Sequence, residues 1–247
     1  MKLTSKIPID WRDLQNQVAR LFNEAGYHAV SPKTIQLVRG QVEVDVFVTA
    51  NHELLNQLIC ECKYWNTPIP QEKIHAFRTI VQDSGSMIGL IIAKTGFQSG
   101  AIEAANQSNV LLRTWDDFQQ MLILPWFHSQ EQKAYDTVYP LMIYTDPLDC
   151  DKQLENLDYQ KYERINESFF EQYFKGLQIL NSLDDNSLIA IKQIDYNGRK
   201  FDAIEDFIEY YVSICQEAIK TYESFFANHP IEDWKLQRPH VDKFKWL

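Results

Sequence analysis

The first half of the chain alternates between helical and strand-like spacing of its apolar residues. Between residues 10 and 26 they recur every three or four positions, which predicts an amphipathic helix with Asp10 as its cap and Gly26 as its stop. The segment GQVEVDVFVTA alternates strictly, so its valines share one face of a strand and Glu43 and Asp45 share the other. We expect a turn at NHELLNQ after this strand. The apolar face expected for the helix consists of Trp11, Leu14, Val18, Leu21 and Phe22.

The next segments complete a domain of mixed composition. LICECKYW predicts a second strand, and the continuous apolar run SMIGLIIAK predicts a strand covered on both faces. IPQEKIHAFRTIVQDSG and SGAIEAANQSN have helical spacing, the latter with a cap at Ser99. VLLRTW predicts a strand, DDFQQMLIL a helix opened by acidic residues, and TIQLVRG a further strand. This order predicts an α/β domain with a mixed central sheet flanked by helices.

The second half of the chain has mainly helical spacing. Two long helices are predicted, over YQKYERINESFFEQYFKGLQIL and over DAIEDFIEYYVSICQEAIKTYESFF. The second helix is expected to begin with a capping box of Asp202 and Glu205. SLIAIKQIDYNGRKF, between them, contains strand-like residues and an Asn-Gly turn whose place in the fold the pattern does not give. We expect the two helices to pack through Phe169, Phe170, Tyr173, Phe207, Tyr211 and Ile214.

Charge and aromatic content divide the chain into the same two halves. The formal net charge is −10, but residues 1–125 hold 11 basic and 12 acidic residues, which leaves 13 basic and 22 acidic residues beyond them. Of the 32 aromatic residues, 22 also lie beyond residue 125. We therefore predict two domains, residues 1–125 and a mainly helical region over residues 126–247.

The sequence indicates a cytoplasmic protein without a membrane partner. No apolar run approaches the roughly 18 residues of a membrane span, and the start of the chain has no apolar core of a secretory signal. The four cysteines are expected to be buried free thiols, because no second cysteine pair accompanies Cys60 and Cys62 to form a zinc site.

Two charged residues inside the strand LICECKYW require an explanation, because burying an unpaired charge is costly. Residues two apart on a strand share a face, so Glu61 and Lys63 project together while Cys60 and Cys62 point to the other side. If the two strands pair through NHELLNQ, Asp45 lies across from Glu61. Converging carboxylates suit a hard cation such as Mg²⁺ or Mn²⁺, which favours metal-dependent phosphodiester hydrolysis. The alternative is a cross-strand salt bridge on an exposed face.

The order of these motifs resembles the PD-(D/E)xK nuclease superfamily, and in detail its Mrr-type restriction endonucleases. Four segments stand in the order of that pattern: LFNEAGYHAV, VEVDVFV, CECKYW and IIAKTGFQSGAIEAANQSNVLL. The resemblance covers about residues 10 to 124. It implies a restriction-endonuclease-like fold and a Mg²⁺- or Mn²⁺-dependent endonuclease. The implied substrate is double-stranded DNA, and the implied role is restriction or defence against foreign DNA.

The resemblance also assigns roles to individual residues. Asp45, Glu61 and Lys63 would be catalytic, and the metal would bind Asp45, Glu61 and the backbone carbonyl of Cys62. The glutamate that the family often has on its first helix is matched here by Gln15, and Gln71 begins the helix after the catalytic strand.

Further candidates follow from the turn TGFQSG. Lys94, Thr95 and Gln98 could contact the DNA backbone, or form only a strand-to-helix connection. Trp65 could stack on a base or pack in the core, and packing is the interpretation that we adopt. Two alternatives to the nuclease stay open: an inactive nuclease-fold module that binds DNA or a protein, and a helical half that forms a homodimer or docks a partner.

Overall fold

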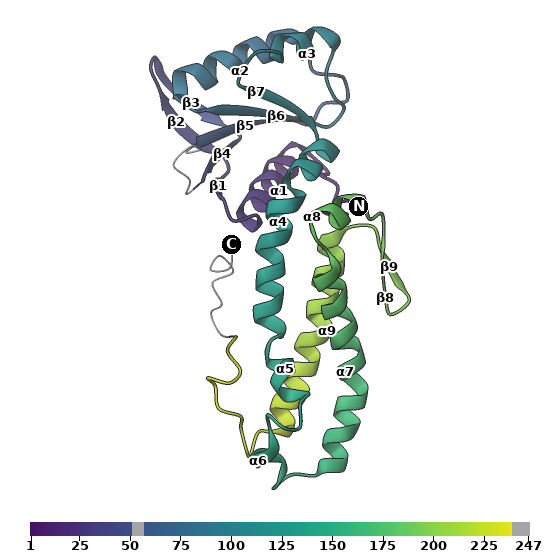
Figure 1. Cartoon of the computed structure of the whole chain (residues 1–247). Helices are drawn as coiled ribbons and strands as arrows, with labels where there is room; N and C mark the ends of the chain where they lie inside the picture. Colours follow the sequence, from purple (N-terminus) through teal and green to yellow (C-terminus); the bar gives the residue numbers. More distant parts are fainter. Residues whose placement is uncertain (51–56, 239–247) are drawn as a thin grey trace. The chain divides into compact units, whose positions relative to one another are not determined.

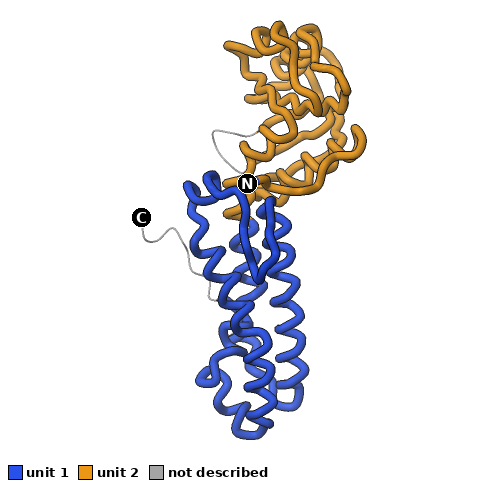
Figure 2. Tube along the Cα trace, turned by 90° about the vertical axis from the view of Figure 1, so that its right-hand side faces the viewer, with its two compact units in different colours: residues 1, 130–247 blue, residues 2–129 orange. Residues whose placement is uncertain are grey.

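The computed structural model describes residues 1–50 and 57–238. The chain divides into two compact units (Figure 2), which we call the sheet unit, residues 2–129, and the helical unit, Met1 with residues 130–247. The turn predicted at NHELLNQ falls on residues 51–57, of which residues 51–56 lie outside the described residues.

A mixed five-stranded sheet forms the centre of the sheet unit (Figure 1). Across the sheet, the first two pairs of neighbouring strands are antiparallel and the last two pairs are parallel. This architecture confirms the predicted restriction-endonuclease-like α/β fold with a mixed central sheet. The strands, in their order across the sheet, are β1 (His28–Val30), β4 (Val46–Thr49), β5 (Gln57–Lys63), β6 (Ile88–Ala93) and β7 (Val110–Thr114).

Helices cover both faces of this sheet. The core on one face includes Ile59 and Ile91 from the strands together with Phe77 and Ala101 from the helices above them. On the other face, Phe22 and Phe118 place their ring centroids 5.4 Å apart. The first face is covered by α2 (Gln71–Ser84) and α3 (Ser99–Ala105), and the second by α1 (Trp11–Glu24) and the beginning of α4 (Trp115–Val138).

The strand predicted over GQVEVDVFVTA is interrupted at Asp45, which corrects the prediction of one continuous strand. Residues before it form β3 (Gly40–Val44), which pairs with β2 (Lys33–Leu37) as a separate two-stranded ribbon, whereas residues after it form β4 of the main sheet. The alternation of valines continues across the break because Val44 and Val46 are both buried. Asp45 therefore lies where the chain passes from one sheet to the other.

Local signals explain the ends of the helices in this unit. The Asp10 side chain caps α1 by accepting a hydrogen bond from the Asp13 N–H at 2.8 Å, as predicted. Trp11, expected in the core, is instead 53% exposed, because periodicity gives the face of a helix but not how far along it the core extends. The cap of α3 is Gln98 rather than Ser99, and its side chain makes no capping hydrogen bond.

The helix α4 is longer than the sequence predicted. DDFQQMLIL ends before Pro125, yet α4 continues through Pro125 to Val138. A proline inside a helix loses one backbone hydrogen bond and is normally destabilising. Buried residues on both sides of it, including Leu122, Trp126 and Phe127, offset that cost through apolar burial.

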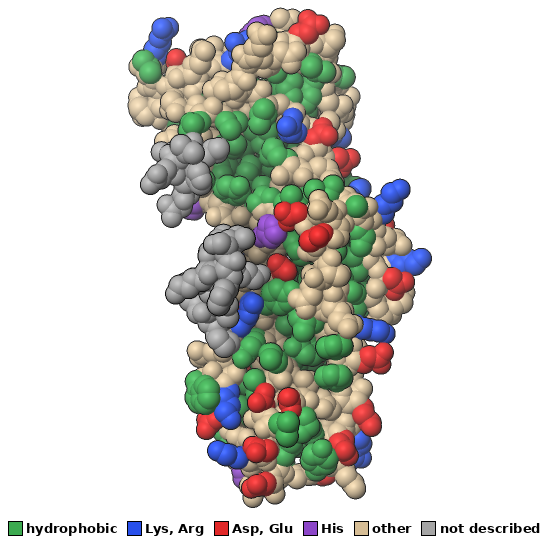
Figure 3. Space-filling model, viewed as in Figure 1, with side chains coloured by type: hydrophobic (Ala, Val, Ile, Leu, Met, Phe, Trp, Pro, Cys, Tyr) green, Lys and Arg blue, Asp and Glu red, His purple; other side chains and the backbone are tan. Residues whose placement is uncertain are grey.

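The helical unit is built around two long helices, α7 (Tyr159–Ser182) and α9 (Ile204–Phe225), which pack side by side (Figures 1 and 2). Tyr211 is fully buried and donates a hydrogen bond from its hydroxyl to the Tyr173 carbonyl oxygen at 3.1 Å. Acidic and basic side chains stand among hydrophobic ones on the face of this unit that Figure 3 shows. The shorter elements are α5 (Pro140–Tyr144), α6 (Asp151–Leu154), α8 (Asp185–Ala190), β8 (Ile194–Tyr196) and β9 (Arg199–Phe201).

Two predictions for the helical unit were wrong in detail. Phe170, expected between the two helices, does not pack in the core: its ring stacks on that of Phe174, and the two residues are 46% and 45% exposed. The capping box does not form, because α9 is capped by Ala203 and the Asp202 carboxylate instead accepts a hydrogen bond from Gln193 at 2.6 Å.

The Asn-Gly turn joins β8 and β9 in a hairpin. No helix in residues 1–50 and 57–238 is long and apolar enough to cross a membrane.

Candidate active site

The pairing of β4 with β5 brings Asp45 to Glu61. These strands are antiparallel, with Val46 opposite Cys60, so the preceding residue Asp45 comes next to Glu61. Asp45 is anchored from two sides. Its Oδ2 accepts a hydrogen bond from the backbone N–H of Cys62 at 2.6 Å, and its Oδ1 accepts one from the Gln15 side-chain amide at 2.7 Å. The carboxylate is therefore held between the first helix and the strand that carries the other charged residues.

Glu61 and Lys63 form an ion pair on the same strand. Lys63 Nζ contacts Glu61 Oε1. The Lys63 side chain is 18% exposed and the Glu61 side chain is 25% exposed. The pair therefore does not match the cross-strand salt bridge on an exposed face that the sequence left as an alternative. Cys60 and Cys62 are buried free thiols, as expected, and burial raises the pKa of both well above its usual value.

The electrostatic balance at Asp45 reflects two nearby carboxylates. Burial and the negative charge of Glu61 raise the pKa of Asp45, whereas the Cys62 N–H, the Lys63 ammonium and the Gln15 amide lower it. The sum of these effects raises the pKa of Asp45 above its usual value. A positive ion between the carboxylates would relieve the part of this shift that comes from their repulsion.

The donors around Asp45 suit a hard divalent cation. Asp45 and Glu61 would supply carboxylate oxygens, and the backbone carbonyl of Cys62, the residue whose N–H contacts Asp45, would add a third oxygen. Mg²⁺ typically binds one or two carboxylates and keeps several waters, so this set fits its preferences. Gln15 would add its amide oxygen only if the amide turned over, since its nitrogen faces Asp45. Within the described residues, no three His, Cys, Asp or Glu side chains form a metal-binding group, so the fit depends on backbone and water oxygens.

Gln71 lies at the first position of α2, as predicted. Its side chain contacts residues of α2 and α3 instead of the carboxylates. Its Nε2 lies 3.0 Å from the ring Nε2 of His75, one turn further along the helix. Its Oε1 lies against Gly100, where an added Cβ would come within 2.9 Å of it. The structure therefore groups Gln71 with α2 and α3 rather than with Asp45.

The three residues proposed to contact DNA connect two loops. Lys94 Nζ donates a hydrogen bond to Asn66 Oδ1 at 2.8 Å, and the Thr95 hydroxyl donates one to the Thr67 carbonyl at 2.9 Å. The Gln98 backbone N–H donates to the Ile69 carbonyl at 3.0 Å. These bonds join the loop after β6 to the loop after β5.

The sequence interpretation missed an aromatic surface next to the ion pair. Trp65 was expected to pack in the core, but it is 38% exposed. The ammonium groups of Lys63 and Lys73 lie 5.8 and 5.9 Å from its ring centroid. A signal was present, since Trp65 follows Lys63 by two positions and an extended chain would place both on one face.

Comparison with known proteins identifies the sheet unit. A family model described as a restriction endonuclease, Mrr_cat, matches residues 8–122. Among solved structures, the chain is similar to one titled "Crystal Structure of Protein of Unknown Function AF1548", at 18% identity and a TM-score of 0.40, over 87% of this chain and all of that one. It is also similar to the MspJI restriction endonuclease in complex with a 27-mer oligonucleotide, at 15% identity and a TM-score of 0.30, over 46% of this chain and 28% of that one.

No curated protein matches the chain. The family match rests on the sequence of residues 8–122, and this range contains Gln15, Asp45, Glu61 and Lys63. Residues 8–122 of this chain therefore form a restriction endonuclease domain of the Mrr type.

Proposed function

We propose that the chain is a divalent-metal-dependent endonuclease that hydrolyses phosphodiester bonds in DNA. Its role would be restriction or defence against foreign DNA in the cytoplasm, with double-stranded DNA as the substrate. The observation that carries the proposal is that Asp45, Glu61 and Lys63 come together inside a domain of the restriction endonuclease family. In this proposal Asp45, Glu61 and the Cys62 carbonyl hold the metal, and Lys63 acts on the attacking water or the phosphate.

Each residue would have a distinct task in hydrolysis. A bound Mg²⁺ or Mn²⁺ would lower the pKa of a coordinated water and stabilise negative charge on the phosphoryl oxygen. The Lys63 ammonium would orient the attacking water or neutralise charge that develops on the phosphate oxygens. Glu61 positions that ammonium through their ion pair, and the Cys62 N–H and the Gln15 amide fix the orientation of Asp45.

The helical unit would regulate the domain, position its substrate or form a homodimer. Phe170 and Phe174 support the last possibility, because two stacked aromatic rings on α7 are nearly half exposed. A second copy of the chain could cover them. Sedimentation velocity tests this role: replacing both residues with serine should turn a dimer into a monomer, and a monomeric wild type would remove the proposal.

A second candidate function is an inactive nuclease-fold module that binds DNA or a protein. It is favoured by the Gln15 amide, which gives Asp45 a neutral hydrogen-bond partner where the family often has a carboxylate. Protein groups also occupy both Asp45 oxygens and Glu61 Oε1. The same geometry is compatible with a site that is ready for metal, so a direct assay must separate the two functions.

The decisive experiment measures cleavage of supercoiled plasmid, linear duplex and branched DNA with Mg²⁺, Mn²⁺ or EDTA. We expect cleavage by the wild type only with the metals. Lys63→Ala should lose at least about a hundredfold in rate while keeping its fold and metal binding, because removing one positioned charge costs on this order. Asp45→Ala should lose cleavage together with metal binding.

Matched surface variants control for general effects of charge. Glu43→Ala removes an exposed carboxylate two residues before Asp45, and Lys33→Ala removes an exposed ammonium on β2. Both should cleave like the wild type. If the wild type cleaves none of the substrates with either metal, the inactive-module function replaces the nuclease.

A further inference from the structure

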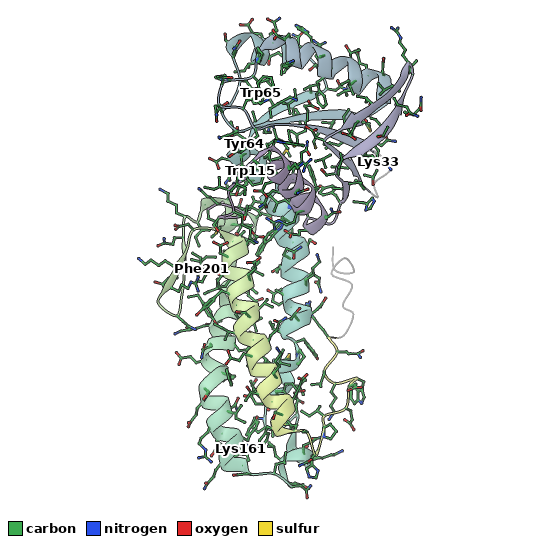
Figure 4. All side chains as sticks on the ribbon, turned by 180° about the vertical axis from the view of Figure 1, so that it is seen from behind. Lys33, Tyr64, Trp65, Trp115, Lys161 and Phe201 are labelled. Atoms are coloured by element: carbon green, nitrogen blue, oxygen red, sulfur yellow. The ribbon has the colours of Figure 1, made fainter. Side chains whose placement is uncertain are left out.

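The surface next to the ion pair combines two aromatic rings with three lysines. Trp65 and Tyr64 directly follow β5 in the sheet unit (Figure 4). The ammonium groups of Lys63 and Lys73 approach the Trp65 ring at 5.8 and 5.9 Å, and that of Lys94 approaches the Tyr64 ring at 4.2 Å. The lysines come from β5, α2 and the loop after β6, so separate parts of the fold bring these charges to two adjacent rings.

The Trp65 ring is accessible for binding. A tryptophan that serves only packing is usually highly buried, whereas this one is 38% exposed. Lys73 is exposed, and no carboxylate pairs with it among the residues that the structure describes. The ring and the ammonium of Lys73 can therefore both contact a ligand from solvent.

The position of the ring relates it to the candidate catalytic residues. Lys63 contacts Glu61 and also lies within cation–π distance of Trp65. A nucleotide whose phosphate lies at Lys63 would therefore have a neighbouring base within reach of the indole. Aromatic side chains flanked by positive charge bind nucleic-acid strands by stacking on base faces, without requiring a particular sequence.

An intact duplex cannot use such a ring, because the faces of its bases are covered by the adjacent base pairs. We propose that Trp65 stacks on an unpaired DNA base next to the scissile phosphate, and that Lys73 binds an adjacent phosphate of the same strand. The substrate class is then double-stranded DNA with a locally unpaired segment at the site of cleavage. This inference rests on the proposed nuclease function and specifies its substrate.

Binding in EDTA tests the inference without cleavage. Fluorescence anisotropy would follow a labelled oligothymidylate of about 15 nucleotides and a blunt hairpin duplex of the same total length, at one fixed ionic strength. The full-length wild type should bind the oligothymidylate at least about tenfold more tightly than the hairpin. Trp65→Ala should weaken this binding roughly tenfold to a hundredfold, the usual effect of removing one stacking side chain, and Trp65→Phe should retain most of it. Lys73→Ala should weaken binding at this ionic strength. In a separate salt titration it should make the slope of log K against log [salt] shallower by about 0.7, the value for one lost phosphate contact on a single strand.

A matched control is available in the helical unit. Trp234 is also exposed, at 70%, and Lys235 Nζ lies 5.8 Å from its ring centroid. Trp234→Ala should bind the oligothymidylate like the wild type. Equal affinity of the wild type for both probes, unchanged binding by Trp65→Ala, or an equal loss in Trp234→Ala would each overturn the inference, as would a wild type that binds neither probe.

The outcomes also separate this inference from the proposed function. If the wild type cleaves DNA with Mg²⁺ but Trp65→Ala binds as tightly as the wild type, the stacking role fails and the nuclease stands. If Trp65→Ala loses affinity but the wild type cleaves no DNA, the nuclease fails and an unpaired-strand binding module stands.

Discussion

Replacing Gln15 with glutamate tests how the first helix contributes to the candidate site. In the wild type, the Gln15 amide donates a hydrogen bond to Asp45 Oδ1 at 2.7 Å. Gln15→Glu changes this donor into an acceptor of almost the same shape and adds a negative charge beside Asp45 and Glu61. We expect the variant to be less stable than the wild type without metal and to respond more strongly to Mg²⁺.

The magnitude follows from two contributions. A hydrogen bond to a charged group contributes about 1.5–3 kcal/mol, and this is lost. Two like charges about 4 Å apart repel by up to about 4 kcal/mol at the effective dielectric of a partly buried site. Solvent and local rearrangement reduce the repulsion, so we expect a total loss of about 2–4 kcal/mol in the free energy of unfolding. For a chain of this size that corresponds to a melting temperature roughly 5–15 °C lower.

Thermal unfolding in EDTA and in a Mg²⁺ titration measures both effects. The variant should have the lower melting temperature in EDTA and the larger rise with Mg²⁺, because a ligand that binds only the folded state stabilises it more when its affinity is higher. Asn16→Asp is the matched control, since it adds the same charge to an exposed position of the same helix. That variant should behave like the wild type in both solutions.

Two results would contradict this reasoning. Equal melting temperatures of Gln15→Glu and wild type in EDTA would mean that the amide does not support Asp45. An equal Mg²⁺ response in both proteins would mean that position 15 does not face the ion, and the departure from the family pattern would then have no consequence for metal affinity.

Two further predictions concern stability. Gly176→Ala should lower the free energy of unfolding by about 2 kcal/mol in a denaturant titration, because the new Cβ would lie 2.1 Å from the buried Tyr211 ring and overpacking exceeds the gain in helix propensity. Gly100→Ala is the control and should stay within about 0.5 kcal/mol of wild type, because its Cβ would lie closest to the flexible end of the Gln71 side chain. An equal loss of unfolding free energy in Gly176→Ala and Gly100→Ala would contradict the packing argument. Gly198→Ala should cost about 1 kcal/mol, since its φ of +74° lies in the left-handed region, and an unchanged unfolding midpoint would show that the hairpin relaxes.

The sequence predicted most elements of the sheet unit in their order because alternation and helical spacing are local properties. It missed the edge strand β1, because its three residues are too few to show a period. It also indicated that Asp45 and Glu61 would meet, since both the facing of residues and the antiparallel pairing follow from period-two strands. It did not predict the interruption at Asp45, because valines are buried on both sides of the break. A residue at which the chain changes sheets has no distinct pattern when both sheets share one core.

Other differences arose where tertiary contacts decide between equal local choices. The helix α7 has apolar residues around much of its circumference, so spacing alone could not show that Phe170 and Phe174 would face outward. Pro125 is a general signal for the end of a helix, but burial of its neighbours outweighs that signal in α4. Trp65 was assigned to the core by residue type, but it lies just beyond the end of β5 and is 38% exposed.

Because Cys62 contacts Asp45 through its backbone N–H, its role in the candidate site is independent of its role in the core. Residue 62 serves the candidate site entirely through its backbone, while its side chain is buried on the opposite face of the strand. Side chains of similar size can therefore replace Cys62 as the core changes, without altering the group that holds Asp45. Only proline, which lacks the N–H, would break this link. The chemistry and the packing at this position can thus diverge independently among descendants of the protein.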